Sequence, residues 1–328
     1  MLKSYKIRDI EINNGLVLAP MSGVTSRPFR RLIKLYNQEH LGLVITEFIS
    51  VEALTRNVQK SIEMMRFTEA ERPFAIQIFG YDIERMVTAA HMVEQSGADI
   101  IDINCGCPAP KVVRKGGGCN LMREPNHLKE MIKAVRKAVS MPLTIKIRSG
   151  WDEKTKNALE IAKIAEGEGV EALAVHGRTR AQLYRGDADW NLVADVANSL
   201  KIPVLGSGDV CDRKSAEERL KYGIAGIFVG RGALANPLIF KDIATNSKTD
   251  IKSSPSMAIE IVEKYKSLLQ EDFHDVACVG KIKQLSSQMC RGFPWRKEIL
   301  VAKNLPEIEQ VIIKVKESIN SNQTQLAA

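Results

Sequence analysis

Short runs of apolar and β-branched residues recur along the first 240 residues and alternate with helical patterns. The runs LVLAPM, LVITEF, FAIQIFG, IIDINCG, LTIKIRSG, ALAVHGR, PVLGSGD and GIFVGRG begin near Leu16, Leu43, Phe74, Ile100, Leu143, Ala172, Pro203 and Gly226. Their spacing of about 25 to 40 residues accommodates a strand, a helix and two loops. Near-continuous apolar strands that alternate with helices indicate a parallel sheet covered on its outer face. Eight such units predict a (β/α)8 TIM barrel, with an open doubly wound sheet as the alternative, because periodicity cannot show closure.

The pattern changes after the run LANPLIF. Residues 241–256, KDIATNSKTDIKSSPS, are rich in Ser, Thr and Lys and contain a proline, which is typical of a linker. From Met257 onward the periodicity is only helical, as in AIEIVEKYKSLLQ and LPEIEQVIIKVKESI. We therefore expect a barrel domain over residues 1–245, a linker over 246–256 and a small all-α domain over 257–328.

Composition excludes several classes of protein. A chain of 328 residues with 45% apolar residues can bury a full core without disulfides or structural metals. The six cysteines include no C-x-x-C pair, so we expect no metal site. The chain starts without an apolar signal region and contains no run near the roughly 20 apolar residues that a membrane span needs, so we expect a cytoplasmic protein with reduced thiols. The net charge of +8 permits a polyanionic partner but does not separate RNA from DNA or an anionic cofactor.

Polar residues end nearly every apolar run. Since catalytic residues of barrels lie at the carboxyl ends of the strands, we expect these side chains to form one site. They are Pro20, Met21 and Ser22; Glu47; Gln77; Asn104 and Cys107; Lys146 and Arg148; His176 and Arg178; Ser207, Gly208 and Asp209; and Gly230 and Arg231. Any one of them alone is also compatible with a capped or solvated loop residue.

Three features of this set fit a flavin. The turns GSGD and VGRG follow the seventh and eighth strands, where barrels bind phosphate through backbone N–H groups, although glycines there also make ordinary tight turns. Lys146 would be a costly buried cation unless it faced an anion or an electron-rich ring. The amide of Gln77 can both donate and accept hydrogen bonds, as the polar edge of a flavin requires.

Cys105 and Cys107 stand one residue apart in a chain with few cysteines. The residues alone leave three interpretations open. The pair is a metal clip, two small buried hydrophobic residues, or one reactive thiol at an active site with an inert neighbour.

Several motifs together resemble those of the bacterial tRNA-dihydrouridine synthases. They are LAPMSGVTSRPFRRL, AIQIFG, DINCGCPAPKVVRKGGGCNLM, IKIRSGW, VHGRTRAQLYRGDADW, GSGDV and VGRGALANPLIF, in family order from about Leu18 to Phe240. The resemblance implies that specific uridines in tRNA are reduced to 5,6-dihydrouridine, with hydride passing from reduced flavin mononucleotide (FMN) to C6. It also implies NADPH as the reductant and Cys107 as the acid that protonates C5, with Cys105 as a bystander and Cys119 as a structural residue.

The resemblance also implies binding roles for individual residues. The FMN-binding residues would be Pro20, Met21, Ser22, Gln77, Lys146, His176, Ser207, Gly208, Asp209, Gly230 and Arg231. Asn104, Arg178 and Arg185 would read the target uracil. Ser207 departs from the family pattern, in which asparagine is common, and this departure affects one expected FMN contact.

The C-terminal region contains a basic segment with interleaved aromatic residues. Its cations are Lys281, Lys283, Arg291, Arg296, Lys297 and Lys303, against the single acid Glu298. Together with Phe293 and Trp295 they predict phosphate contacts and base stacking on RNA, and a solvated helix face is the alternative. A histidine usual in the family is absent from GKIKQLSSQ.

Two other functions stay open: a flavin barrel oxidoreductase that acts on a free pyrimidine, and a non-catalytic RNA-binding protein.

Overall fold

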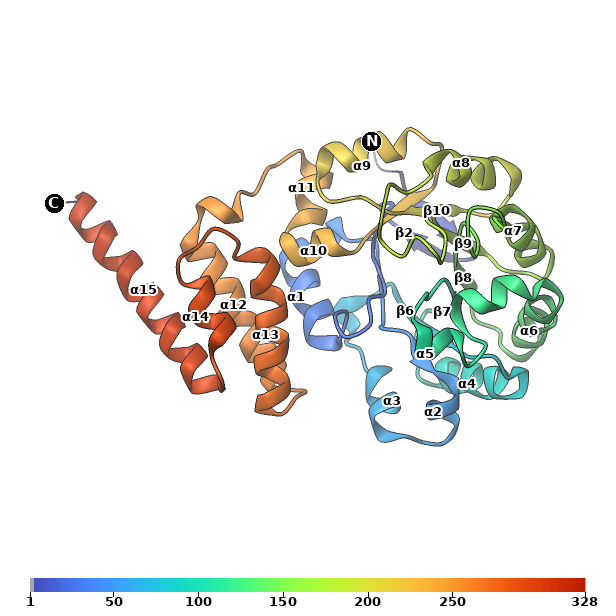
Figure 1. Ribbon diagram of the computed structural model, residues 1–328, viewed down its shortest axis with the longest axis horizontal. Coiled ribbons are helices and arrows are strands. Elements are labelled where there is room, and N and C mark those ends of the chain that lie inside the picture. Colours follow the sequence, from blue (N-terminus) through green and yellow to red (C-terminus); the bar gives the residue numbers. More distant parts are fainter. Residues whose placement is uncertain (1–2, 328) are drawn as a thin grey trace. The chain divides into compact units, whose positions relative to one another are not determined.

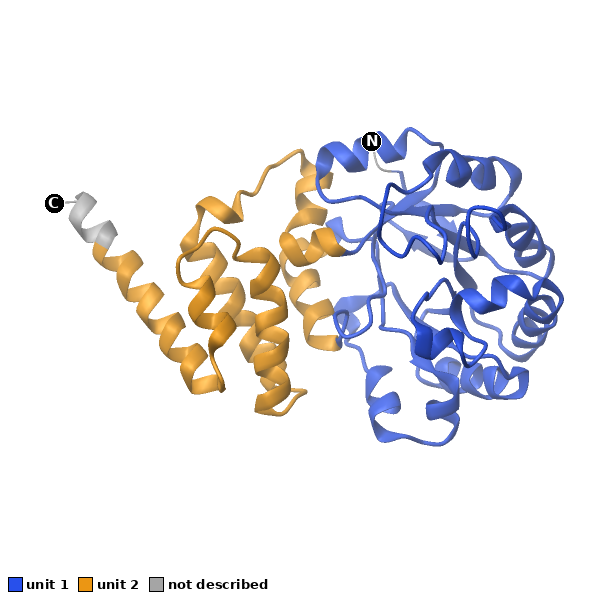
Figure 2. Ribbon diagram, in the orientation of Figure 1, with its two compact units in different colours: residues 1–26, 39–230 blue, residues 27–38, 231–328 orange. Residues whose placement is uncertain are grey.

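The chain forms two compact units in the computed structural model, which describes the backbone of residues 3–327 and the side chains of residues 3–321. The first unit comprises Met1–Ser26 and Glu39–Gly230, and the second comprises Arg27–Gln38 and Arg231–Ala328 (Figure 2). The observed boundary therefore falls directly after the last barrel strand, earlier than the expected boundary at residue 245. The helix that follows the first barrel strand also belongs to the second unit.

In the first unit, parallel strands close into a barrel (Figure 1). The eight strands are β3 (Leu16–Leu18), β4 (Leu43–Ile45), β6 (Phe74–Phe79), β7 (Ile100–Cys105), β8 (Leu143–Arg148), β9 (Ala172–His176), β10 (Val204–Ser207) and β11 (Gly226–Val229). Each strand of this set pairs with the next, and β11 pairs with β3, so the ladder closes on itself. A short strand, β5 (Ile49–Ser50), pairs with β6 beyond the end of β4. The predicted TIM barrel is confirmed, and the open sheet is excluded.

The strands begin where the apolar runs predict, with one difference of a single residue. β10 begins at Val204 rather than at Pro203. Proline has no N–H to donate to a ladder, which explains the shift. The carbonyl of Pro203 still accepts a hydrogen bond from the backbone N–H of Leu173 at 3.0 Å.

The barrel interior changes from apolar to polar along the strands. Alternate residues of a strand share one face, so Ala75 and Gln77 point the same way, as do Ile100, Asp102 and Asn104. Ala75 and Ile100 belong to the buried apolar cluster of the interior. The carboxyl halves of the same strands therefore present polar side chains to the barrel mouth.

A hairpin that the sequence pattern did not predict packs against this apolar cluster. It consists of β1 (Tyr5–Ile7) and β2 (Ile10–Ile12), paired antiparallel. Ile7 and Ile12 are 1% and 0% exposed and belong to the same cluster as the first residues of the barrel strands. Strands of three residues are too short to give a periodic signal.

Helices surround the strands of the first unit (Figure 1). They are α2 (Val51–Thr55), α3 (Gln59–Met64), α4 (Ile83–Gln95), α5 (Pro110–Val113), α6 (Pro125–Ala138), α7 (Ala158–Gly167), α8 (Trp190–Ser199) and α9 (Arg213–Leu220). This unit also contains the 3-10 turns η2 (Glu69–Glu71) and η3 (Gly118–Arg123), whereas η1 (Gln38–His40) begins at the last residue of the Arg27–Gln38 segment and η4 (Ile251–Ser253) belongs to the second unit. In α4, the residues Met86, Ala89, Ala90 and Val93 are buried at helical spacing. Asp82 caps this helix by accepting a hydrogen bond from the backbone N–H of Arg85.

The second unit is helical. It contains α1 (Arg27–Asn37), α10 (Arg231–Ala235), α11 (Ile239–Thr245), α12 (Pro255–Gln270), α13 (Asp275–Met289), α14 (Arg296–Val301) and α15 (Leu305–Ala327). Phe29 of α1 packs edge-on against Tyr265 of α12 with ring centroids 6.1 Å apart, and Arg27 pairs with Asp272 at 2.6 Å. Asn37 donates to the carbonyl of Pro237 at 2.7 Å. These contacts explain why α1 joins this unit.

The segment predicted as a linker, residues 246–256, has structure of its own. It contains η4 and the first residues of α12. The hydroxyl of Thr249 donates to Asp242 Oδ1 at 2.6 Å, and Ser254 caps α12 with Pro255 in the first turn.

Within residues 3–327, none of the helices combines the length and the apolar character that a membrane-spanning helix requires.

Candidate active site

The barrel brings the predicted polar residues to the carboxyl ends of its strands. Pro20, Met21 and Ser22 follow β3, and Gly230 follows β11. Gln77 lies in β6, Asn104 is the penultimate residue of β7, and Cys107 follows that strand. Lys146 lies in β8, His176 ends β9, and Ser207 ends β10. Arg231 begins α10 in the second unit. In a closed parallel barrel these strand ends share one face of the first unit.

A chain of hydrogen bonds runs across this face from Thr144 to Cys107. The Thr144 hydroxyl donates to Asp102 Oδ1 at 2.6 Å, and Gln77 Nε2 donates to Asp102 Oδ2 at 2.5 Å. Asn104 Nδ2 donates to Gln77 Oε1 at 2.7 Å. The backbone N–H of Cys107 donates to Asn104 Oδ1 at 2.9 Å. An ionised carboxylate only accepts, so Asp102 determines the orientation of both amides and, through them, the position of the Cys107 backbone.

Two members of this hydrogen-bond chain, Asp102 and Thr144, were not predicted as site residues, and Asp102 is the one that joins the others. Its signal was a single acid inside the apolar run IIDINCG, two residues before Asn104 and therefore on the same strand face. Asp102 is 3% exposed. Burial raises its pKa, while the hydrogen bonds from Thr144 and Gln77 and the charge of Lys146 oppose the shift.

The raised pKa of Asp102 predicts a pH dependence of stability. A carboxyl whose pKa is higher in the folded state stabilises the fold most when it is protonated. We therefore expect its contribution to the free energy of unfolding to decrease as the pH rises from about 4 through the folded pKa. The measurement is denaturant unfolding of the wild type and of Asp102→Asn at a series of pH values. The free energy of unfolding of the wild type minus that of the variant should fall as the pH rises. A difference that is constant or rises with pH would contradict the raised pKa of Asp102.

The side-chain amide of Gln77 is hydrogen-bonded within the protein at both its nitrogen and its oxygen. Its side chain is 0% exposed, with the amide nitrogen on Asp102 and the amide oxygen on Asn104. Asn104 keeps 6% of its surface exposed. The role that the geometry supports for Gln77 is to orient Asn104, and its direct contact with a flavin ring stays a prediction.

The segment after β7 holds Cys107 against a glycine-rich turn. The backbone N–H of Cys119 donates to the carbonyl of Cys107 at 3.0 Å. Gly118 has φ +59°, and a Cβ at this position would lie 2.5 Å from the carbonyl oxygen of Cys107, so only glycine fits. The run KGGGCN thus folds back over the cysteine.

The thiols of this segment differ in exposure. Cys107 keeps 7% of its surface exposed, and burial raises its pKa while the neighbouring Arg148 and Lys111 oppose the shift. Cys105 is 0% exposed, and its pKa is raised by burial. Burial also raises the pKa of Cys119 to about 12. Of the three thiols, Cys107 alone reaches the surface, and its raised pKa keeps it in the neutral S–H form that can donate a proton.

Lys146 is a partly exposed cation in the carboxyl half of β8. Burial, followed by the charge of Arg148, lowers its pKa to about 8. Its Nζ lies 5.3 Å from the centroid of the Phe228 ring, and among the side chains described it has no hydrogen-bond acceptor and no carboxylate in salt-bridge contact. Such a cation fits a site for an anionic or electron-rich ligand.

Arg178 and Asp209 pair with each other, a contact that the sequence analysis did not predict, and their binding roles stay predictions. Arg178 is 2% exposed, and its Nη2 donates to both carboxylate oxygens of Asp209, at 2.7 and 2.8 Å. Its Nε donates to the carbonyl of Arg185 at 3.3 Å. The guanidinium that was expected to read uracil therefore ties the loop after β9 to the loop after β10.

The backbone of the loop after β10 lies close to neighbouring residues. Gly208 has φ +126°, and a Cβ there would lie 2.6 Å from Ala188 and 3.2 Å from the His176 ring. Asp209 has φ +56° and also accepts a hydrogen bond from the backbone N–H of Ala188 at 2.9 Å. The glycine lets His176 and the chain after Ser207 approach closely.

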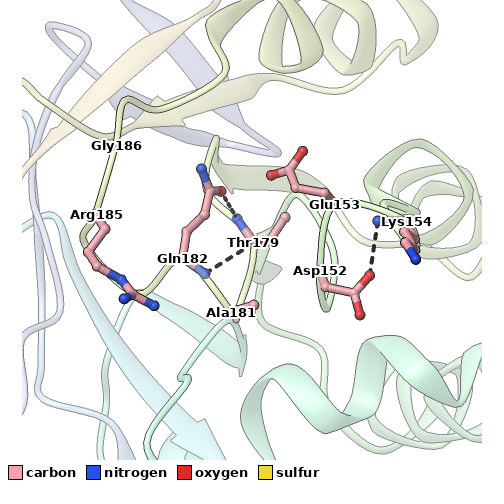
Figure 3. A pocket seen from close by; sticks show the side chains of 8 residues that line it. All are labelled: Asp152, Glu153, Lys154, Thr179, Ala181, Gln182, Arg185 and Gly186. Carbon is pink, nitrogen blue, oxygen red and sulfur yellow. Dashed lines mark hydrogen bonds between the residues drawn. The ribbon is translucent and has the colours of Figure 1, made fainter.

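An open pocket of about 630 Å³ lies between the loops after β8 and β9 (Figure 3). It is lined by Asp152, Glu153, Lys154, Thr179, Ala181, Gln182, Arg185 and Gly186. Gln182 Oε1 accepts from the backbone N–H of Thr179 at 2.7 Å, which fixes the turn that carries the exposed Arg185. Of the two arginines predicted to read the base, the structure places only Arg185 in an open pocket.

The cations predicted to contact RNA lie on α13 and α14 and at the turn between them, except Lys303, which follows α14. Arg291 and Lys297 are exposed, and Lys281, Lys283 and Arg296 are partly exposed.

Within residues 3–321, no group of three or more His, Cys, Asp and Glu side chains could hold a metal ion.

The aromatic residues of this segment are not available for base stacking, so that prediction was wrong. Phe293 and Trp295 are 9% and 7% exposed. Their rings stack on each other with centroids 5.0 Å apart and planes 10° apart. The two rings therefore contribute to the core of the helical unit.

Comparisons with known proteins identify the family of this chain and the likeness of its fold. The model of the family Dihydrouridine synthase (Dus) matches residues 17–324. A probable tRNA-dihydrouridine synthase of Rickettsia bellii is 38% identical over 305 residues, which cover 92% of this chain and 93% of the relative. The tRNA-dihydrouridine synthase B of Pseudomonas syringae pv. tomato is 39% identical over 264 residues, covering 80% of this chain and 77% of the relative. The fold resembles histamine dehydrogenase from Rhizobium sp. 4-9, with a TM-score of 0.59 and 14% identity over 81% of this chain and 50% of the other. The chain belongs to the dihydrouridine synthase family.

Proposed function

We propose that this protein reduces specific uridines in tRNA to 5,6-dihydrouridine, with FMN as its cofactor and NADPH as the reductant. The observation that carries the proposal is Cys107, largely buried with 7% of its surface exposed and held by Asn104 at the mouth of a barrel. The same mouth presents Lys146, which has no carboxylate in contact among the side chains described. Relatives named tRNA-dihydrouridine synthases support tRNA as the substrate. The proposed place of action is the cytoplasm.

The residues at the barrel mouth fit an FMN group. Lys146 offers a positive charge to the polar edge of the ring, and Pro20 and Met21 offer apolar surface. A Cβ on Gly230 would lie 3.3 Å from Met21 Sδ, so the glycine lets the Met21 side chain pack closely against the chain after β11. Ser207 and Gly208, with Gly230 and Arg231 after the next strand, offer the backbone N–H groups that suit a phosphate. Ser22 and His176 complete the proposed set.

The proposed chemistry needs one hydride donor and one acid. FMN, when bound and reduced, supplies the hydride to C6 of uracil. The resulting negative charge at C5 is neutralised by a proton from Cys107, whose raised pKa keeps the thiol protonated. Asn104 orients this cysteine through its backbone, and Arg185 offers donors to the uracil from the neighbouring pocket.

The helical unit is proposed to contact the tRNA backbone. Arg291 and Lys297 are exposed, and Lys281, Lys283 and Arg296 are partly so. Exposed cations on a basic chain favour binding to a polyanion, with an affinity that decreases as salt increases. Because Phe293 and Trp295 are buried, the proposed contact is with phosphates and not with stacked bases.

The test of the function is dihydrouridine formation in a tRNA transcript that lacks modifications. With FMN and NADPH, the purified protein is expected to add two hydrogens to a defined subset of uridines, detected by mass spectrometry of the digested RNA. A double bond reduced only in free uracil or another free pyrimidine would favour a metabolite oxidoreductase. Purified protein that binds tRNA but neither retains nor takes up flavin would favour a non-catalytic RNA-binding protein.

A further inference from the structure

Two arginines pack on one tryptophan at the rim of the barrel. Arg123 Cζ lies 4.5 Å from the centroid of the Trp151 ring, and Arg180 Cζ lies 4.6 Å from the same centroid. The three residues come from the successive loops after β7, β8 and β9. Backbone hydrogen bonds from Arg180 to the Gly150 carbonyl and from Ala181 to the Trp151 carbonyl, both 2.9 Å, hold two of these loops together.

The two guanidinium groups have no counter-ion in this stack. Within the described side chains, neither Arg123 nor Arg180 forms an ion pair or a hydrogen bond, and the Nε of Arg180 is buried without a partner. The acid that follows Arg123 in the chain, Glu124, accepts hydrogen bonds from Tyr81 and Asn120 instead, at 2.7 and 2.8 Å. The pKa of Glu124 is lowered chiefly by the hydrogen bond from Tyr81 and to a smaller extent by the charge of Arg123. Two like charges held against one ring, with no carboxylate in salt-bridge contact, are stabilised by an added anion.

The loop after β7 extends this charge along the rim. Residues 103–123 contain no Asp or Glu, and their cations Lys111, Arg114, Lys115 and Arg123 are all exposed. A line of exposed cations without acids suits a chain of phosphates better than a single phosphate group.

We propose that the stack of Arg123, Trp151 and Arg180 binds backbone phosphates of the substrate RNA next to the target uridine. The stack adjoins the pocket of Arg185, because Asp152 and Ala181, the neighbours of Trp151 and Arg180 in the chain, line that pocket. Trp151 is the positioning residue of this surface, since its ring holds both guanidinium groups in place. This inference rests on the proposed function, and it gives the barrel unit an RNA contact separate from the cations of the helical unit.

The experiment measures binding of a fluorescent unmodified tRNA transcript to the flavin-loaded protein over a range of salt concentrations. Arg123→Gln combined with Arg180→Gln is expected to lower the affinity about tenfold or more. It is also expected to reduce the slope of log K against log salt by roughly 1.4 to 1.8, as loss of two phosphate contacts requires. Lys133→Gln combined with Lys163→Gln removes the same charge from exposed positions on α6 and α7 and serves as the matched control.

Trp151→Phe keeps a ring face and is expected to retain most of the affinity, whereas Trp151→Leu is expected to behave like the double arginine variant. In a chain that already carries Lys281→Gln, Arg291→Gln and Lys297→Gln, the arginine substitutions are expected to lower the slope by the same further amount. KM for tRNA should rise while kcat at saturating tRNA stays near the wild-type value.

A slope equal to that of the matched control would overturn the inference, even if the melting temperature falls, because the stack would then be purely structural. A raised KM for NADPH with unchanged tRNA binding would assign the arginines to the phosphate of the reductant and would overturn it as well. Wild-type protein that binds tRNA with the predicted salt dependence but forms no dihydrouridine would refute the proposed function. The proposed RNA contact of the Arg123, Trp151 and Arg180 stack would not be affected by that result.

Discussion

Cys107→Ala is expected to bind tRNA and flavin normally yet to form dihydrouridine about 10² to 10⁴-fold more slowly than the wild type, the usual contribution of a general acid. The substitution removes the only one of the three neighbouring thiols that reaches the surface, while the backbone N–H that Asn104 holds is retained. The measurement is single-turnover oxidation of the prereduced protein by unmodified tRNA, followed by flavin absorbance. Because the residues that bind the cofactor are unchanged, reduction by NADPH should proceed at the wild-type rate.

Cys105→Ala is the matched control for this prediction. The Cys105 side chain is fully buried within β7, so its truncation should cost stability on the order of 1 kcal/mol and leave most of the activity. An equal loss of activity in both variants would indicate a paired thiol site. A full rate in Cys107→Ala would remove the proposed acid.

Lys146→Met is expected to bind flavin about 10- to 100-fold more weakly than the wild type, as the loss of a charge-assisted contact in a partly buried site would produce. The variant, purified in the same way as the wild type, should lack most of the yellow colour of bound flavin. Equilibrium titration of the flavin-free protein with FMN measures the effect, and Lys163→Met, an exposed lysine on α7, serves as the control.

The pH dependence of FMN binding gives this prediction a second readout. Lys146 has a pKa of about 8 in the ligand-free protein, and the proposed contact requires its protonated form. FMN affinity is therefore expected to be highest below pH 8 and to decrease as the pH rises above it, and Lys146→Met should lack this dependence. Wild-type affinity that is independent of pH between 7 and 9, or a variant that binds FMN as tightly as the wild type, would show that Lys146 does not face the cofactor.

The sequence alone was sufficient for the alternating strands and helices of the barrel, because hydrophobic periodicity and turn residues act over short distances along the chain. Closure of the sheet was decided by the pairing of β11 with β3. The apolar runs predicted where the strands begin, with Pro203 as the one shift, and they placed Asn104, Lys146 and His176 at strand ends. The motif around Cys107 indicated the family, and the family model matches the chain. The short hairpin β1–β2 escaped notice because its strands are too short to show a period.

Only the tertiary structure decided how the polar residues pair. Asp102 binds Gln77 from 25 residues away, Gln77 binds Asn104 across 27 residues, and Arg178 binds Asp209 across 31. Such partners depend on the register of strands that are distant in sequence, and periodicity does not encode that register. The burial of Phe293 and Trp295 likewise depends on contacts between helices and not on local pattern. The sequence therefore determined which residues stand at the barrel mouth, and the packing of strands and helices decided which of them stay available to a ligand.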